Sequence, residues 1–509
     1  MNSLSLSLRS LLVLLILLQP LLLAGQASTA TSQKTDSEDK RVTELLAALD
    51  HLVEQNQKLE KQNSELMDQI NELRKALDSN TPVTATSHTP QNSTAPTHPQ
   101  NPKQEVGSSN QEPYKWGAYT PNLGYKVANT DHGDLSVSIY TYARYLNQLG
   151  LDPSYTDAFG KVHTVQQRQD FQLQKVQIKF LGWMFDPKFR YFLYAWTSNA
   201  SQGLGAQVVL AGNLNYSFNK AFSVGAGIRS LPGTRSVEGN FPFWLGVDSR
   251  LIADEFFRPS YTSGVWAWGD LGKHFNYIAM IGNNLSTLGV SAAQLDNGFN
   301  TISTALVWTP AEAYGQGFGD FEDHQKPVTR FGIHFNRSDE SKQSQPSSEQ
   351  FENTQLRLSD GSVIFTPNLF GQGITINDAR YLMTSFDGGL KYRGFSLEGE
   401  YYLRWLNHFL GPGTTGLPTL FDHGMQLQTS VMAIPKLMQV YLGGSTIFGQ
   451  YGTPWDFRSG INYFPFKNKV VRWNTEFLYL YRSAVGYTSV PFPVGGSGPV
   501  FHTTWELAF

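Results

Sequence analysis

The residues with the clearest chemical potential are arginines that gather around one segment of the chain. Arg235, Arg250 and Arg258 lie within residues 231–263, and Arg229 comes just before that segment. A guanidinium presents a planar fork of N–H donors that suits carboxylate and phosphate groups, so such a cluster could attract anions. The same segment is also rich in Asp and Glu. We therefore treat these four arginines as candidate anion guides at a constriction. The alternative is that the arginines pair with the Asp and Glu residues of the same segment and fix it in place.

A second set of basic residues falls on the polar face of stretches that alternate apolar and polar side chains. In residues 470–482, for example, Trp473 and Phe477 alternate with Arg472 and Glu476. Successive side chains of a strand point to opposite faces, so the basic residues share one face. The members of this set are Arg144, Lys179, Arg330, Arg404, Arg458, Arg472 and Arg482. The same face carries fewer carboxylates, namely Glu398, Glu400, Asp456, Glu476 and Glu506.

Composition excludes several classes of site. The chain has no cysteine, which excludes disulfides, thiolate metal sites, a cysteine nucleophile and a lipidated N-terminus. Its 11 histidines occur without an H-E-x-x-H pair, and neither a G-x-S-x-G elbow nor a Walker loop is present. A net charge of -3 is too small to suggest a nucleic-acid surface. We predict no catalytic residue, no metal site, no cofactor and no nucleic-acid partner.

The alternating pattern continues to the C-terminus and predicts the fold. In residues 500–509, Phe501, Trp505 and Phe509 occupy one face and polar residues most of the other. Short turns alternate with long polar or glycine-rich connections, as in membrane barrels that have short turns at one end and long loops at the other. The sequence therefore predicts an all-β fold: an antiparallel transmembrane β-barrel of about sixteen strands, over residues 114–509.

A barrel of this size is too wide for its wall side chains to fill, so its lumen holds water unless a segment plugs it. Residues 231–263, which follow the fifth predicted strand, are the best candidate for narrowing the lumen. One connection breaks the alternation of lengths. The segment 310–328 falls where a short turn is expected, and a missed or misassigned hairpin is one explanation of its length.

Three segments precede the barrel. Residues 1–27 have a basic flank, a short apolar run and small residues, which is typical of a secretory signal peptide. Residues 36–79 carry a heptad repeat and predict an oligomerising coiled coil. Its d positions are Leu45, Leu52, Leu59, Leu66 and Leu73. Asn56 and Asn63 at a positions favour a dimer without excluding a trimer. Residues 80–113 are rich in Ser, Thr and Pro, which predicts a disordered linker.

Parts of the barrel region resemble a known family. Residues 231–236 read Leu-Pro-Gly-Thr-Arg-Ser, residues 253–261 read Ala-Asp-Glu-Phe-Phe-Arg-Pro-Ser-Tyr, and Gly-Val-Trp and Gly-Asn-Asn-Leu follow at 264–266 and 282–285. These stretches look like the phosphate-selective porin O and P family of bacterial outer-membrane channels. The resemblance covers about residues 115–509. It implies a trimeric, sixteen-stranded, anion-preferring channel in which arginines along the pore and lysines near the constriction guide the anion. Residues 231–263 contain no lysine.

We therefore expect an outer-membrane porin that gives passive diffusion to small hydrophilic solutes, with a weak anion preference and phosphate as the narrower prediction. Its expected partners are outer-membrane lipids, other copies of the chain in a homotrimer, and the solutes or anions themselves. The N-terminal region is expected in the periplasm. The alternative is a structural tether, in which the coiled coil joins the outer membrane to peptidoglycan. An enzyme is the weakest class, because no catalytic motif is present.

Overall fold

The computed structural model describes residues 119–120, 123–198, 207–237, 241–288, 290, 292–295, 298–311, 313–346, 355–487 and 489–509. Two compact units divide the chain at residues 95 and 96, and all described residues belong to the second unit. The predicted signal peptide, coiled coil and linker, residues 1–113, lie outside the described residues. In the described ranges, no helix is long and apolar enough to cross a membrane.

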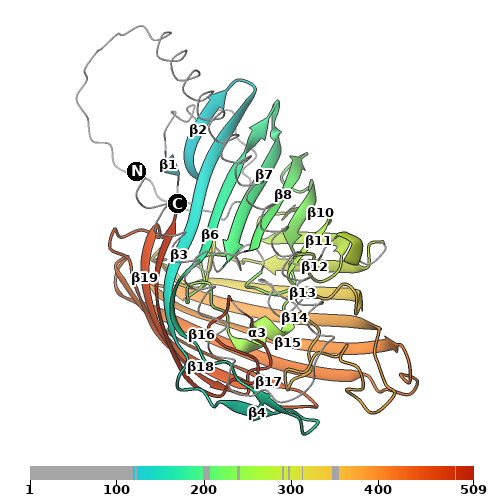
Figure 1. Ribbon diagram of the computed structural model, residues 1–509. Coiled ribbons are helices and arrows are strands. Elements are labelled where there is room, and N and C mark those ends of the chain that lie inside the picture. The colour runs from blue at the N-terminus through green and yellow to red at the C-terminus, as the bar shows by residue number, and fades with distance from the viewer. Residues whose placement is uncertain are drawn as a thin grey trace, which may run out of the picture. The chain divides into compact units, whose positions relative to one another are not determined.

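Within the described residues, eighteen strands form one antiparallel sheet, and all but β1 and β2 form a closed ring of sixteen (Figure 1). The first half of the ring consists of β3 (Gly133–Asn147), β6 (Gln169–Met184), β7 (Asp186–Ser198), β8 (Gln207–Ser217), β9 (Ser223–Ser230), β10 (Tyr261–Leu271), β11 (Phe275–Asn283) and β12 (Thr301–Trp308). The second half consists of β13 (Val328–Ser341), β14 (Asp378–Tyr392), β15 (Phe395–Leu410), β16 (Leu420–Ile434), β17 (Met438–Phe448), β18 (Trp455–Tyr463), β19 (Val471–Tyr481) and β20 (Gly498–Ala508). The predicted all-β barrel of about sixteen strands is confirmed.

The last strand closes the ring against the first. β20 pairs with one half of the β3 edge, from Asn147 to Tyr140. The other half of that edge pairs with β2 (Gly124–Thr130), which in turn pairs with β1 (Tyr119–Thr120). At the junction the Ile139 amide donates to the Phe509 carbonyl over 2.8 Å, and the Phe509 amide donates back over 2.9 Å. The chain end thus completes the hydrogen bonding of the seam, which avoids an open strand edge there.

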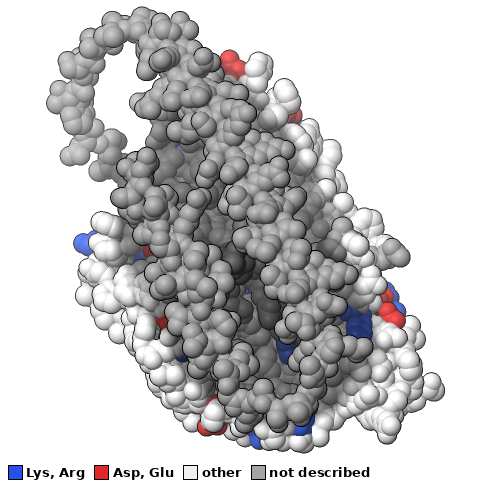
Figure 2. Space-filling model, viewed as in Figure 1, with Lys and Arg blue, Asp and Glu red and all other residues white. Residues whose placement is uncertain are grey.

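The ring strands turn apolar side chains outward and polar side chains inward. On β19, Trp473 and Phe477 are more than 40% exposed, whereas Arg472, Asn474 and Glu476 are buried. In Figure 2 most of the described surface on the visible face is uncharged. An exterior this apolar would favour association in water, but it suits contact with lipid hydrocarbon.

Connections differ in length at the two ends of the barrel. One end has the short turns 218–222, 272–274, 393–394, 435–437 and 464–470 and the single residue 185. The other end has the connections 148–168, 199–206, 231–260, 284–300, 342–377, 411–419, 449–454 and 482–497, most of which are longer. Small elements decorate this end: β4 (Ser154–Thr156) pairs with β5 (Val162–Thr164), and η3 (Ala292–Gln294) is a single 3-10 turn.

The connection between β12 and β13, residues 309–327, is the long exception at the short-turn end. None of its described residues belongs to a strand, so the suggestion of a missed hairpin in this segment was wrong. We call residues 309–327 the inward turn and residues 231–260 the inward loop, because both have side chains or carbonyls that contact the lumen wall.

Candidate solute passage

The inward loop is seated on one side of the lumen. Its short helix α3 (Ile252–Phe257) is fully buried and packs against β16, β17 and β18 (Figure 1). At the start of α3, the Ala253 amide donates to Ser445 Oγ over 3.0 Å, so wall side chains satisfy amides that a helix leaves without intrahelical partners. At its end, the Phe257 ring stacks on Tyr402 with centroids 5.0 Å apart. The loop is therefore held by the wall along its whole helical part.

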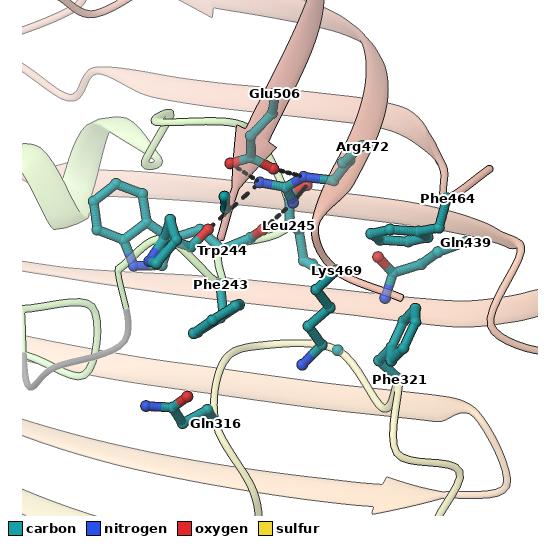
Figure 3. Close-up of a pocket in the computed structure, with 13 residues that line it drawn as sticks. Phe243, Trp244, Leu245, Gln316, Phe321, Gln439, Phe464, Lys469, Arg472 and Glu506 are labelled. Atoms are coloured by element: carbon teal, nitrogen blue, oxygen red, sulfur yellow. Dashed lines mark hydrogen bonds and ion pairs between the residues drawn. The ribbon is translucent and has the colours of Figure 1, made fainter. Parts of the chain in front are cut away.

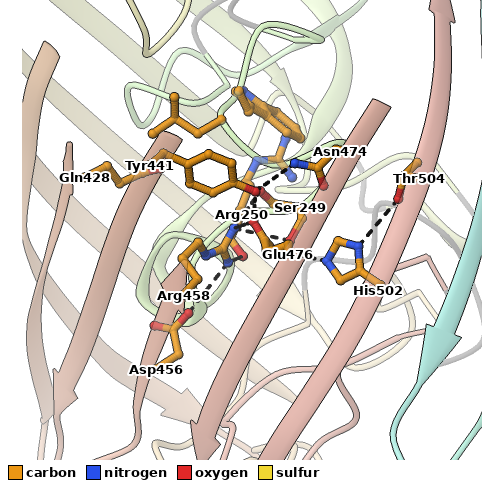
Figure 4. A network of polar contacts seen from close by, with 12 residues as sticks. Ser249, Arg250, Gln428, Tyr441, Asp456, Arg458, Asn474, Glu476, His502 and Thr504 are labelled. Carbon is orange, nitrogen blue, oxygen red and sulfur yellow. Dashed lines mark hydrogen bonds and ion pairs between the residues drawn. The ribbon is translucent and has the colours of Figure 1, made fainter. Parts of the chain in front are cut away.

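A buried polar network centred on Glu476 attaches the loop to the wall (Figure 4). Glu476 accepts hydrogen bonds from Tyr441 Oη over 2.6 Å and from Ser249 Oγ of the loop over 3.3 Å, and its Oε1 lies 3.0 Å from His502 Nε2. Arg458 Nη1 lies 3.6 Å from Glu476 Oε2 and donates to the Ser249 carbonyl over 3.0 Å. These wall charges serve to position the loop.

The three candidate arginines of the inward loop are all buried in ion pairs. Arg250 and Arg258 converge on Glu255, each with an N–O distance of 2.8 Å. Arg235 reaches across to Glu398 on β15 at 3.0 Å. Each of the three arginines is less than 10% exposed. The geometry thus matches the pairing arrangement that the sequence left open as an alternative, and it brings Arg250 and Arg258 together.

The inward turn approaches the inward loop from the opposite end of the barrel. The Gly317 carbonyl accepts from Arg235 Nη2 of the loop over 2.9 Å and from Lys391 Nζ of β14 over 3.0 Å. The Phe318 amide donates to the Phe243 carbonyl of the loop over 3.1 Å. A buried apolar cluster joins the two segments to the wall, and it consists of Trp244, Leu245, Phe318 and Tyr441. The two segments therefore meet inside the lumen.

A small pocket of about 30 Å³ lies at this junction (Figure 3). Lys469 lies between the rings of Phe243 and Phe321, at 4.9 and 5.3 Å from their centroids, and its Nζ pairs with Glu322 at 2.8 Å. Burial alone would raise the pKa of the Glu322 carboxyl, but the Lys469 ammonium lowers that pKa below its ordinary value of 4.5. The Glu322 carboxyl therefore stays charged at neutral pH, and its ion pair with Lys469 holds the inward turn to the connection before β19.

A second ion pair holds the inward turn in place. His324 Nδ1 lies 2.5 Å from Asp320 Oδ1, and the other Asp320 oxygen accepts from the Gly394 amide over 2.8 Å. The hydrogen bond with Asp320 raises the pKa of His324 above its ordinary value of 6.5, although partial burial opposes that rise. The turn is thereby linked to the tight connection between β14 and β15.

The other predicted wall residues occupy different environments. Arg144, Arg404 and Arg472 are buried and donate to carbonyls of inward-folded connections, those of Ser489, Arg357 and Trp244 respectively. Arg404 also pairs with Asp422, Arg472 with Glu506, and Arg330 with Asp387. Arg482 lies just after β19 at the barrel rim and is exposed. Only Lys179 and Arg229 among the predicted residues are both on the lumen wall and half exposed.

Exposure of the lumen face shows where space for solutes is left. On β3 and on β11 to β20 nearly all lumen-facing side chains are buried, because the inward loop, the inward turn and other connections cover them. On β6 to β10 many are half exposed. We call these residues the passage wall: Lys179, Leu181, Trp183, Arg190, Phe192, Val209, Ala211, Asn213, Arg229, Trp268 and Asp270. The part of the described lumen face that is open to solvent therefore lies along β6 to β10.

Most of the passage wall was not singled out from the sequence. Phe192, Asn213 and Trp268 lie in alternating strands and could have been assigned to the lumen face by spacing alone. Their exposure could not be predicted from spacing, because it depends on where the loops pack. Among the described residues, no group of three or more His, Asp or Glu is arranged to hold a metal ion.

Comparison with solved structures finds barrels of low similarity. They include the outer-membrane expressed OmpT of Vibrio cholerae, at 9% identity over 75% of this chain and 99% of that chain, with a TM-score of 0.44. The anion-selective porin from Comamonas acidovorans has 11% identity over 74% and 100%, with a TM-score of 0.44. OccAB1 of Acinetobacter baumannii has 8% identity over 74% and 96%, with a TM-score of 0.38. No protein-family model and no curated protein matches the chain. At these similarities we base no functional conclusion on the likeness.

Proposed function

We propose that this chain is a bacterial outer-membrane porin that gives passive diffusion to small hydrophilic solutes, with a weak preference for anions. One observation carries the proposal: the closed ring exposes apolar side chains outside and keeps polar and charged side chains inside. A soluble protein buries its apolar residues, so this inverted distribution fits a barrel surrounded by lipid. The half-exposed passage wall supplies the route through it.

The charges of the passage wall support the anion preference. The wall carries three basic residues, Lys179, Arg190 and Arg229, and a single carboxylate, Asp270. Near the short-turn end of β10, Asp270 accepts a hydrogen bond from the side-chain amide of Asn276. Fixed charges near a narrow route raise the local concentration of the opposite ion. A narrower preference for phosphate rests on the family resemblance alone.

The proposal extends to assembly and location. The heptad repeat of residues 36–79 supports oligomerisation, and a homotrimer is what the family resemblance implies. The heptad region would lie in the periplasm with the linker 80–113, and the signal peptide 1–27 would direct export. Placing the short-turn end in the periplasm follows from the usual inequality of connections in membrane barrels. The tether to peptidoglycan has no supporting observation in the described residues.

The test is the reversal potential of the purified full-length protein in a planar bilayer under a potassium chloride gradient. We expect a steady current whose reversal potential indicates modest anion preference, and truncation of residues 31–110 should leave that current intact. A cation-preferring current would contradict the anion preference. If correctly folded, heat-modifiable protein gave no current, that result would contradict the channel function itself.

A further inference from the structure

We propose that Arg337 and Arg380 form a binding site, on the outer face of the barrel, for the phosphate group of a glycolipid in the surrounding membrane. This inference rests on the proposed porin function, which places the outer face in lipid and the long-connection end of the barrel in the outer leaflet. We call Arg337, Asp339 and Arg380 the arginine site. It lies outside the lumen and takes no part in the solute passage.

Strand alternation places the arginine site on the outer face. On β13, Ser338 and Glu340 are buried on the lumen side, so the alternate residues Arg337 and Asp339 face outward. Arg380 on β14 pairs across the strands with Asp339 and faces outward with it. Asp339 is two residues from the end of β13, and Arg380 is two residues from the start of β14. The site therefore lies close to the long-connection end of the barrel.

Charged side chains are otherwise rare on this face. Among the described outward positions of β13 to β20, Asp378 is the only further Lys, Arg, Asp or Glu. Asp378 begins β14 at the rim, where the exposed Lys342 carries the opposite charge. An arginine that faces lipid is costly at the middle of the membrane and nearly free of cost at the interface. A cluster of charges near the end of these strands therefore indicates the level of the lipid headgroups.

Two cations share one carboxylate at the arginine site. Asp339 Oδ1 accepts from Arg380 Nε over 2.6 Å, and Asp339 Oδ2 accepts from Arg337 Nη2 over 3.2 Å. Among the described residues, Arg337 donates to no other group, and the two arginine side chains remain 41% and 27% exposed. The carboxylate thus holds two guanidinium groups together and leaves a surplus positive charge. Guanidinium groups bind phosphate through paired N–H donors, so the site suits a phosphate that approaches from the membrane side.

The apolar surface beside the site specifies a lipid rather than free phosphate. Arg337 pairs across the strands with Ile302 on one side and with Leu382 on the other. Further from the rim on β13, Phe335 and Ile333 are 39% and 43% exposed on the outer face. Inorganic phosphate gains nothing from these side chains. The acyl chains of a lipid can cover them while its phosphate stays at the arginines, because burial of apolar surface and attraction between charges act on the same molecule.

The first test measures which lipids the full-length protein retains in detergent micelles, by native mass spectrometry. The probes are lipid A that carries its phosphates and the same lipid A without them. The protein should retain the phosphorylated form preferentially, and an equal concentration of inorganic phosphate should not displace it. Equal retention of the two forms, or displacement by inorganic phosphate, would overturn the assignment to a lipid phosphate.

Substitutions then test the two arginines. The Arg337→Gln and Arg380→Gln double variant should bind phosphorylated lipid A about tenfold more weakly, the change expected from loss of one charge-assisted hydrogen bond. Arg482→Gln is the matched control, because it removes an exposed arginine just after β19 at the same end of the barrel, and it should bind as the wild type does. If the double variant fails to fold, adding Asp339→Asn removes all three charges, and that triple variant should bind equally weakly.

Asp339→Asn alone separates a binding site from an ion-pair cluster that only stabilises the fold. This substitution keeps both arginines and removes the carboxylate that repels phosphate, so phosphorylated lipid A should bind at least as tightly as to the wild type. Weaker binding in Asp339→Asn, or unchanged binding in the double variant, would overturn the site.

Failure of this site and failure of the porin function give different results. Loss of the preference for phosphorylated lipid A, while the bilayer current persists, overturns the site alone. Absence of any current from folded protein that still retains phosphorylated lipid A overturns the porin function and leaves the site in place.

Discussion

Replacing Glu476 by Gln should loosen the inward loop, because this carboxylate is the centre of the network that seats it. Its side chain is completely buried and accepts hydrogen bonds from Tyr441 and Ser249. It is also the carboxylate nearest to the Arg458 Nη1 that holds the Ser249 carbonyl of the loop. Gln keeps the volume and removes the charge, so the Arg458 guanidinium loses part of its compensation in a buried site.

The size of the effect follows from the burial of the pair. Removing one partner of a buried ion pair costs about 3–5 kcal/mol, because the remaining charge is left uncompensated. If the loop can leave the wall and let water reach Arg458, that cost is relieved by unseating. The unseated population would then rise by about 100-fold to 5,000-fold, since about 1.4 kcal/mol corresponds to a factor of ten. Asp456, whose Oδ2 lies 3.6 Å from Arg458 Nη2, retains part of the compensation and places the result towards the lower figure.

Single-channel recording and heat denaturation measure this change. Glu476→Gln should show increased current noise and a lower midpoint for the heat-induced mobility shift than the wild type. Glu340→Gln is the control, because Glu340 is a buried lumen carboxylate on β13 that contacts Ser338 and the Leu285 amide, away from the Glu476 network on β17 to β20. The control should lower the midpoint without added noise. Wild-type noise in Glu476→Gln, or equal noise in both variants, would refute the idea that this network seats the loop.

Three further predictions concern the inward turn and the seam. The hydrogen bond to Asp320 raises the pKa of His324, so its contribution to stability is complete below pH 6.5 and is lost as the pH rises through the raised value. Heat-denaturation midpoints of wild type and His324→Ala should therefore differ at low pH and converge at high pH; a constant difference would contradict this. Gly317→Ala and Gly272→Ala both place alanine at positive φ, at a cost of about 1–2 kcal/mol each, but only at Gly317 would the new methyl lie 2.4 Å from a carbonyl of the inward loop. Conductance should rise in Gly317→Ala alone, and equal conductance in the two variants would rule out the contact. Deleting Phe509 removes the paired backbone hydrogen bonds at the seam and should lower the yield of folded barrel in outer-membrane fractions; an unchanged yield would count against that role.

The two-sided character of each strand explains what the sequence could predict. Because side chains alternate, Trp473 and Glu476 had to face opposite sides once residues 471–481 formed a strand, whatever the loops did. The number of strands followed from counting such stretches and the turns between them. This information is local, so it needs no knowledge of tertiary packing.

Exposure within the lumen is a tertiary property, and here sequence reasoning reached its limit. Lys179 and Arg458 look alike in sequence, since each is a basic residue on the polar face of a strand, yet Arg458 lies under the inward loop and Lys179 lies on the passage wall. A weak signal for the inward turn did exist. Gly315, Gly317 and Gly319 alternate in that segment, and glycine permits the close backbone approach seen at the Phe243 carbonyl.

The division of the lumen into a covered and an open side separates two demands on its charged residues. On the covered side, cations such as Arg235 and Arg472 are each paired with a carboxylate and bonded to carbonyls, so a passing solute meets little net field from them. Replacing them should chiefly affect loop seating and stability. On the open side, the partly exposed Lys179 and Arg229 face the space along β6 to β10. Anion preference should therefore depend on very few residues of this barrel, and it could be changed there with little effect on folding.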